Sequence, residues 1–177
     1  MRTWFTSDTY SWHANIIDYC QRPYTSVGEM NDNLTRRWNE TVAQDDMVYH
    51  PGGFAFGPRE RWPGILGALQ GRKILCLGNH DRKATYMIEQ VGLEDAFRNR
   101  VVEVDGVRLW LHHYPTNNAL DQRGFQGPPA PEEYDVALCG HIHQLWKLRD
   151  GCVNVGVDVW DFTPIVLDEI LTAANAK

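Results

Sequence analysis

Five of the seven histidines of this 177-residue chain stand in three short polar segments, and each segment follows an apolar run typical of a strand. Asp8 follows a fourth such run, and the three segments are Asn79-His80-Asp81, His112-His113 and His141-Ile142-His143. Imidazole nitrogen, carboxylate oxygen and amide oxygen all bind zinc, manganese or iron ions. Each segment alone is explained equally well as a turn or a hydrogen-bonded strand end. Together they indicate a metal centre.

The strands that must carry these segments are predicted from short apolar runs bounded by polar turns. Asp105-Gly106 and Asp150-Gly151 indicate two hairpins. The predicted strands lie in the runs TWFTSD, DMVYH, KILCLGNHD, VVEVDGVRLWLHHYP and DVALCGHIH. Strand ends at one edge of a sheet are where α/β proteins assemble their sites, so we expect the polar segments to meet there.

Helices are predicted between the strands. Ser26 and Glu29 form a capping-box pattern. An apolar stripe with a four-residue step follows, made of Met30, Leu34, Trp38 and Val42. Residues 59–70 are predicted to be helical with a late start or a bend at Pro63, and residues 84–91 and a segment from about Asp168 are also predicted helices. This alternation predicts α/β layers with a mixed sheet or two packed sheets.

Two segments are predicted to be loops. One runs from the first strand to about Tyr24, and Trp12 within it could form the wall of a pocket, stack on a base or belong to the core. The other, residues 115–133, is long enough to be a substrate lid.

The composition is that of a soluble globular protein, with 43% apolar and 23% charged residues. A net charge of -6 argues against broad, sequence-independent binding of nucleic acid, since such binding needs a basic surface. The four cysteines form no CxxC pair, and Cys76 and Cys139 are predicted to be buried thiols. No apolar run reaches the length of a membrane span, and a cytoplasmic protein is expected.

The polar segments occur in an order that resembles the calcineurin-like metallophosphoesterases. The matching regions are SDTYSWHANI, YHPGGFAFG, LGNHDR, LHHYP, CGHIH and NVGVDVWDFTP, which together span nearly the whole chain. The resemblance implies a single domain over residues 1–177 and a layered α-β-β-α sandwich with mixed sheets. It also implies a hydrolase in which two divalent ions about 3.5 to 4 Å apart bracket a phosphate.

Carried over position by position, the resemblance implies a role for each matching residue. The candidate metal ligands are Asp8, Asn79, His113, His141 and His143. His80 and Asp81 are the candidate catalytic residues, and His13 and Asn79 the candidate substrate-binding residues. Asp158 and Asp161 could orient the histidines, although we favour turn capping for both.

Two positions depart from the family pattern. Tyr10 stands where the family has a histidine, and Gly53 stands where it has the aspartate that bridges both ions. Glycine has no ligand atom, and the phenol of tyrosine titrates near 10, so neither replaces what is lost. The first site then keeps Asp8 and His143. The second keeps Asn79, His113 and His141, which suit one ion (Mn, Zn, Fe or Ni) or partial occupancy.

Three functions remain open at this point. The protein could be a phosphoesterase that acts through a single or reorganised metal site. It could be a degenerate member that binds a phosphate ester or a nucleotide, or a protein-binding module on the same fold. We favour a degenerate or weak phosphoesterase that binds at most one metal ion and a phosphate-containing ligand, because loss of the bridging ligand harms catalysis more directly than binding.

Overall fold

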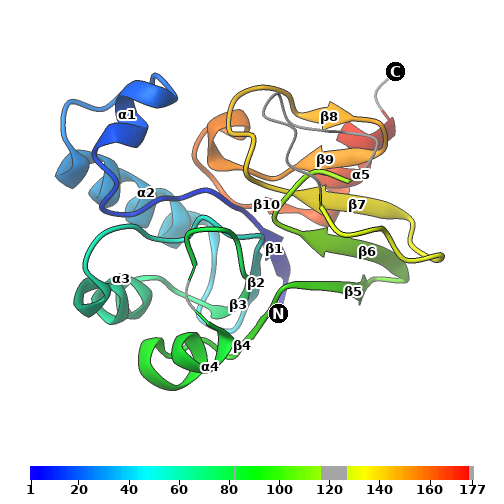
Figure 1. The fold of residues 1–177 in the computed structure, drawn as a ribbon, viewed down its shortest axis with the longest axis horizontal. Coiled ribbons are helices and arrows are strands. Elements are labelled where there is room, and N and C mark those ends of the chain that lie inside the picture. The colour runs from blue at the N-terminus through cyan, green and yellow to red at the C-terminus, as the bar shows by residue number, and fades with distance from the viewer. Residues whose placement is uncertain (82, 117–126, 176–177) are drawn as a thin grey trace.

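The computed structural model describes residues 1–81, 83–116 and 127–175 and contains two five-stranded mixed sheets (Figure 1). In the first sheet the strand order is β10-β1-β2-β3-β4. Strands β1 to β4 run parallel, and β10 runs antiparallel to β1. The bounds are β1 (Thr3–Phe5), β2 (Met47–His50), β3 (Arg72–Cys76), β4 (Asp95–Phe97) and β10 (Ile165–Val166).

The second sheet has the order β5-β6-β7-β9-β8. Its central strands β6, β7 and β9 run parallel, and a hairpin closes each edge, β5–β6 on one side and β8–β9 on the other. The bounds are β5 (Asn99–Val104), β6 (Val107–His112), β7 (Val136–Cys139), β8 (Leu148–Arg149) and β9 (Cys152–Asn154). Both hairpins turn at the predicted Asp-Gly pairs.

Within the described residues, five α-helices accompany the sheets, and α1 to α4 lie on the left in Figure 1. Three further single turns occur: 3₁₀ turns at Arg59–Arg61 and Val157–Val159, and a π-helical turn at Met87–Val91. The helix bounds are α1 (Asn15–Tyr19), α2 (Val27–Thr41), α3 (Trp62–Ala68), α4 (Ala84–Tyr86) and α5 (Leu167–Asn175).

The longest helix, α2, begins where the sequence predicts. Ser26 Oγ accepts a hydrogen bond from the backbone N–H of Glu29 at 3.2 Å, so it satisfies one donor of the first turn. The Glu29 carboxylate in turn accepts from the N–H and hydroxyl of Thr25, each at 2.7 Å. Pro63 lies in the first turn of α3, where proline is tolerated, so that helix begins at Trp62 after a 3₁₀ turn.

Two apolar clusters hold the layers together. The first fills the space between the sheets and includes Phe5 and Cys76 from one sheet and Leu109 and Leu138 from the other. The second covers the opposite face of the first sheet, where Trp4, Val48 and Leu75 pack against residues of the covering helices, among them Trp38, Val42, Trp62 and Leu66. Burial of these aromatic and aliphatic side chains is the main stabilising term for such layers.

The predicted fold class, α/β with two mixed sheets and accompanying helices, is confirmed. Some local predictions are wrong: α1 forms inside the stretch expected to be a loop, and β4 was not anticipated. The predicted loop at 115–133 falls largely on 117–126, which lie outside the described residues, as does Arg82. No helix of the described chain combines the length and the apolar character that crossing a membrane requires.

Candidate functional site

The predicted site residues meet where strands of both sheets end. Asp8 follows β1 by three residues, and His113 and His141 follow β6 and β7. The Asp8 Oδ2 atom accepts a hydrogen bond from the His141 backbone N–H at 2.8 Å, although 133 positions separate the two residues. His113 Nε2 lies 2.9 Å from Asn79 Oδ1, which connects the end of β6 to the end of β3. The expected gathering of these segments therefore occurs.

The backbone at the site is held in an unusual conformation. Asp8, Tyr10, His141 and His143 have positive φ angles of 56°, 48°, 73° and 50°. Non-glycine residues adopt this region rarely, and such strain concentrates at functional sites because the surroundings must hold it in place. Arg22 supplies part of that hold, since its guanidinium donates to the carbonyl oxygens of Asp8 at 2.6 Å and Thr9 at 3.0 Å.

Asp8 is completely buried, and its two carboxylate oxygens differ. Oδ2 accepts hydrogen bonds from Ser7 Oγ at 2.9 Å and from the His141 backbone N–H. Oδ1 has no hydrogen-bond partner among the described residues. A buried carboxylate oxygen without a donor is costly, and a cation is one way in which proteins satisfy it.

Tyr10 and Gly53, the two positions expected to depart from the family pattern, lie in contact with each other. A Cβ atom added at Gly53 would lie 2.8 Å from Tyr10 Cε2 and 2.5 Å from Asp8 Oδ1. The tyrosine ring therefore lies against the space where a side chain at position 53 would begin. Burial raises the pKa of Tyr10, and the charges of Asp8 and Asp81 raise it further, so the phenol stays protonated. The part of the site around Tyr10 and Gly53 therefore does not fit the first metal ion that the family resemblance implies.

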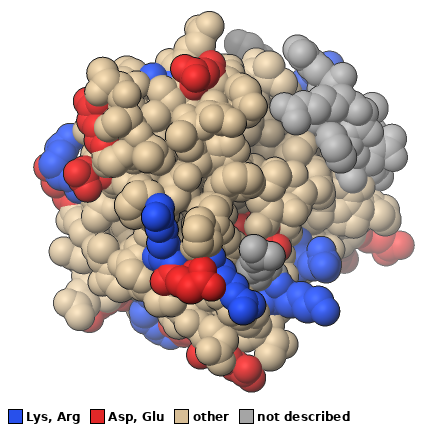
Figure 2. All heavy atoms as spheres, turned by 60° about the vertical axis from the view of Figure 1, so that its left-hand side comes forward, with Lys and Arg blue, Asp and Glu red and all other residues tan. Residues whose placement is uncertain are grey.

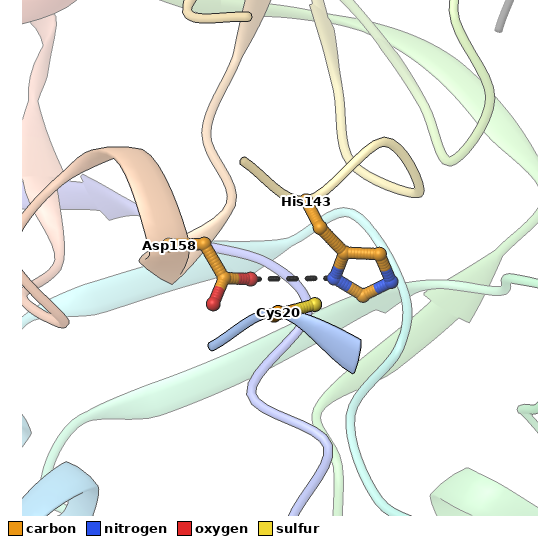
Figure 3. A group of neighbouring side chains, drawn as sticks. All are labelled: Cys20, His143 and Asp158. Atoms are coloured by element: carbon orange, nitrogen blue, oxygen red, sulfur yellow. Dashed lines mark hydrogen bonds and ion pairs between the residues drawn. The ribbon is translucent and has the colours of Figure 1, made fainter. Parts of the chain in front are cut away.

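His143, a candidate ligand of that first ion, belongs to a buried ionic cluster. Its Nδ1 atom lies 3.3 Å from Asp158 Oδ2, and the side chain of Cys20 points toward the His143 ring (Figure 3). Asp158 also receives two hydrogen bonds from Arg22, at 2.8 and 3.0 Å. The side chains of Arg22 and Asp158 are only 0% and 2% exposed, so water screens their attraction little.

Hydrogen bonds within the cluster favour the protonated form of His143. Burial lowers the pKa of His143, but the hydrogen bonds to Asp158 and Cys20 and the charge of Asp8 outweigh burial and raise this pKa to about 10. Ligand atoms of Cys20, His143 and Asp158 lie within 4.8 Å of one another, which is close enough to hold a metal ion. The guanidinium of Arg22 on the same carboxylate opposes a second cation there.

The second half of the site has a geometry that fits an ion. His113 Nδ1 lies 2.9 Å from the Pro51 carbonyl oxygen, so this nitrogen carries the hydrogen and donates it. The other ring nitrogen, Nε2, lies 2.9 Å from Asn79 Oδ1, so two atoms of the kinds that bind metal ions face each other. Two ligands at right angles around an ion, each about 2.1 Å from it, lie about 3 Å apart. The His141 ring lies 5.0 Å from that of His113.

Asp81, a predicted catalytic residue, accepts hydrogen bonds from three backbone N–H groups. Its Oδ2 accepts from the backbone N–H groups of Gly53 at 3.0 Å and Gly78 at 2.7 Å, and its Oδ1 accepts from Phe54 N–H at 3.2 Å. The carboxylate therefore joins the loop after β2 to the loop after β3. Asp81 therefore positions these loops.

The remaining predicted residues lie on the rim of the site. His80 is exposed, and its ring lies 5.7 Å from that of Tyr10. The His13 ring lies 5.5 Å from Tyr10, and its Nδ1 accepts a hydrogen bond from the Ile16 N–H at 3.1 Å. Asp161 lies away from the histidines and pairs with Arg37 at 2.8 Å.

Two participants in this site, Arg22 and Cys20, are not predicted from the sequence. Asp158, which could orient the histidines although turn capping is the favoured role, does contact His143. Arg22 and Asp158 are 136 positions apart, so no local pattern could have paired them. Arg22 stands between Gln21 and Pro23, so its neighbours in the sequence do not indicate that it is buried.

Comparisons with known proteins identify the family of this chain. A family model described as the calcineurin-like phosphoesterase superfamily domain matches residues 1–159. An uncharacterized protein of Methanocaldococcus jannaschii is 28% identical over 180 residues, which cover 96% of this chain and 89% of the relative. The Gene 66 protein of Mycobacterium phage D29 is 29% identical, with 97% of this chain and 95% of the relative covered.

The solved structures include one with the same fold along its whole length. A protein of unknown function from Aquifex aeolicus superposes with a TM-score of 0.73 at 26% identity, and the match covers 96% of this chain and 97% of that one. The family model spans most of the chain, and its match includes every candidate ligand. The chain therefore belongs to the calcineurin-like phosphoesterase superfamily.

Proposed function

We propose that this protein binds phosphate esters at a site with a single divalent metal ion and turns them over slowly. Asn79, His113 and His141 would hold the ion. The observation that carries the proposal is the 2.9 Å approach of His113 Nε2 to Asn79 Oδ1 while His113 Nδ1 donates to a backbone carbonyl. Metal-binding histidines typically donate their other ring hydrogen in this way.

The case against a second ion rests on the contents of the other half of the site. A neutral, buried Tyr10 lies against Gly53, and His143 is engaged with Asp158. Without a bridging carboxylate, nothing reduces the repulsion between two closely spaced dications. Family members with both ions bracket the phosphate from two sides. A chain with one ion loses half of that stabilisation, which is why we expect slow turnover.

The chain's own residues would complete the site as follows. The bound ion would polarise the phosphoryl oxygens as a Lewis acid. His80 is exposed next to Asn79, so it can form a hydrogen bond to an ester oxygen. Asp81 fixes the loop that carries both residues. A compartment that keeps thiols reduced, such as the cytoplasm, suits the protein because its four cysteines are free and buried.

The metal stoichiometry tests this proposal directly. Protein purified without chelator and titrated with Mn²⁺ or Zn²⁺ should bind at most one ion per chain, as measured by calorimetry and elemental analysis. His113→Ala should weaken binding by at least about tenfold, the scale of losing one ligand. Tyr10→Phe, which removes only the hydroxyl, should leave binding unchanged. Two tightly bound ions per chain, or none in the wild type, would refute the proposal.

Turnover is tested with p-nitrophenyl phosphate and its bis ester in the presence of Mn²⁺, Ni²⁺ or Zn²⁺. We expect slow, metal-dependent hydrolysis that His113→Ala abolishes and His80→Ala reduces. Hydrolysis that persists unchanged in His113→Ala would mean that the reaction does not occur at this site. Retained folding of each variant is checked by circular dichroism.

A further inference from the structure

A row of aromatic rings leads away from the candidate phosphate site. His80 is adjacent in sequence to Asn79, and its ring lies 5.6 Å from that of Phe56. Phe56 lies 4.2 Å from His13, and His13 lies 6.2 Å from Tyr19. The rings come from the loop after β3, the loop after β2, the loop before α1 and the end of α1. Three separate chain segments therefore build one continuous row.

The outer end of this row faces solvent. Phe56 is 40% exposed and Tyr19 is 67% exposed. Within the described chain, five large apolar side chains are exposed, and the two aromatic ones among them both belong to the row. Exposed aromatic rings gathered beside a polar site are typical of a ligand-binding surface rather than of a core.

Basic side chains accompany the rings. Arg59 and Arg61 follow Phe56 in the same loop, and Lys83 follows His80; all three are exposed. The guanidinium of Arg61 lies 4.6 Å from the centre of the Trp12 ring, next to His13 in sequence. Figure 2 brings the α1–α3 side of the molecule forward and shows Lys and Arg side chains on the lower half of this face, with acidic side chains among them. Basic side chains are thus available beside the row, although the net charge of the protein is -6 and Glu60 pairs with Arg59.

We propose that the row Tyr19–His13–Phe56–His80 is a stacking site for the base of a small nucleotide whose phosphate occupies the metal site. This inference rests on the proposed function, because it needs a phosphate at Asn79 and His113. Bases stack on aromatic side chains without regard to their identity, and basic residues attract the phosphate. A long nucleic acid is a poorer occupant, because the chain lacks the broad basic surface that one requires.

The experiment compares ligands that share a phosphate and differ in the base. Binding of AMP, ribose 5-phosphate and inorganic phosphate to the metal-loaded protein is measured by calorimetry. We expect AMP to bind about five- to hundredfold more tightly than ribose 5-phosphate, the range that one stacked base supplies. Phe56→Ala should remove most of this difference, and Phe56→Trp should restore it.

Two further variants keep the test decisive. Tyr19→Ala alters the exposed end of the row, so it tests stacking if Phe56→Ala fails to fold. Ile88→Ala is the matched control, because Ile88 is 37% exposed but lies outside the row, and it should change neither affinity.

The outcomes separate the two proposals. If inorganic phosphate binds but AMP and ribose 5-phosphate bind equally well, the stacking site is refuted and the phosphate site stands. If Phe56→Ala weakens AMP and ribose 5-phosphate by the same factor, Phe56 acts on the fold of the site, which also refutes stacking. If neither phosphate nor either ester binds, the proposed function itself fails.

Discussion

Tyr10 and Gly53 contact each other, so we expect substitutions at these two positions to have coupled effects. The tyrosine ring lies where the first atom of a side chain at position 53 would collide with it, 2.8 Å from that Cβ position. Asp8 Oδ1 lies closer still to that Cβ position, at 2.5 Å, and the φ angle of Gly53 is +68°, so a side chain there would be strained whatever residue stands at position 10. We therefore expect changes at the two positions to be coupled without compensating each other fully.

The first prediction concerns this pair. Gly53→Asp alone should destabilise the protein by at least roughly 1–3 kcal/mol, the range for overpacking a core, because the φ angle of +68° strains any side chain and the new Cβ would lie 2.5 Å from Asp8 Oδ1 and 2.8 Å from Tyr10 Cε2. Adding Tyr10→His should recover part of that loss, because the ring edge moves away, and should increase metal binding and phosphoesterase rate. The remaining close contact of the new side chain, with Asp8, places two carboxylates together. We therefore expect Mn²⁺ to raise the melting temperature of the double variant more than that of the wild type.

A four-member thermodynamic cycle checks this prediction. Unfolding free energies of the wild type, both single variants and the double variant are measured by denaturant titration. Additive changes would show that Tyr10 and Gly53 are independent. A folded double variant with no gain in metal affinity would mean that another feature blocks the first metal position.

At the scale of elements, Arg22 connects loops that neither sheet would fix by itself. It lies just beyond α1, donates to the loop after β1 and pairs with Asp158 in the 3₁₀ turn after β9. Through Asp158 it reaches His143 in the loop after β7. Its removal would leave Asp158 and the strained loop after β1 without their main buried donor.

The second prediction follows from this arrangement. Arg22→Met should lower the free energy of unfolding by about 3–5 kcal/mol, the range for breaking one side of a buried ion pair. Arg22→Lys should recover only part of it, because an ammonium cannot make the paired contacts of a guanidinium. Arg36→Met is the matched control: its exposed pair with Glu40 on α2 is worth about 0.3–0.5 kcal/mol. Equal effects at positions 22 and 36 would contradict the role of the cluster.

Elements with strong local signals could be predicted from the sequence. The helix after Ser26 carries both a cap and an apolar stripe, and the hairpins carry Asp-Gly turns. The three-residue strand β4 has no such signal and forms only because β3 offers it an edge. The residues at strand ends were found because parallel strands bring them to one edge. The Arg22–Asp158 pair and the Tyr10–Gly53 contact exist only in three dimensions.

At the scale of the whole molecule, stability should depend on pH through buried histidines. His50 is 2% exposed. Its Nε2 lies 3.1 Å from Thr9 Oγ1, which donates its own hydrogen to the Phe54 carbonyl, so Nε2 is the donor. Nδ1 is then unprotonated and has no partner among the described residues. Burial lowers the pKa of His50 to about 4, although the charge of Asp8 opposes the shift.

The third prediction gives the direction of this dependence. The unfolded chain takes up a proton at His50 near pH 6.5 and the folded chain only near pH 4, so protonation favours unfolding between these values. The contribution of His50 to stability is complete above pH 6.5 and should fall by on the order of 3 kcal/mol by pH 4. His50→Gln should flatten this slope. His112, whose pKa burial also lowers to about 4, should keep some of it. Identical slopes in the wild type and the variant, measured by urea unfolding, would contradict the assignment.

The two sheets meet at the site itself. Ser7 donates its N–H to the Val155 carbonyl and accepts from the Val157 N–H, each at 3.0 Å. Asp8 adds its carboxylate bond to the His141 backbone. The candidate site is therefore also the place where the end of β1 is fastened to the loops of the second sheet.

This contact gives Asp8 a structural role that does not depend on a metal ion. A related protein without the first ion would still be destabilised by replacing this aspartate, because its carboxylate joins the end of β1 to the loop after β7. A structural role alone is therefore enough to retain the residue. The presence of Asp8 is therefore no evidence that catalysis is retained. The imidazole of His113 and the amide of Asn79 are better indicators of a metal site.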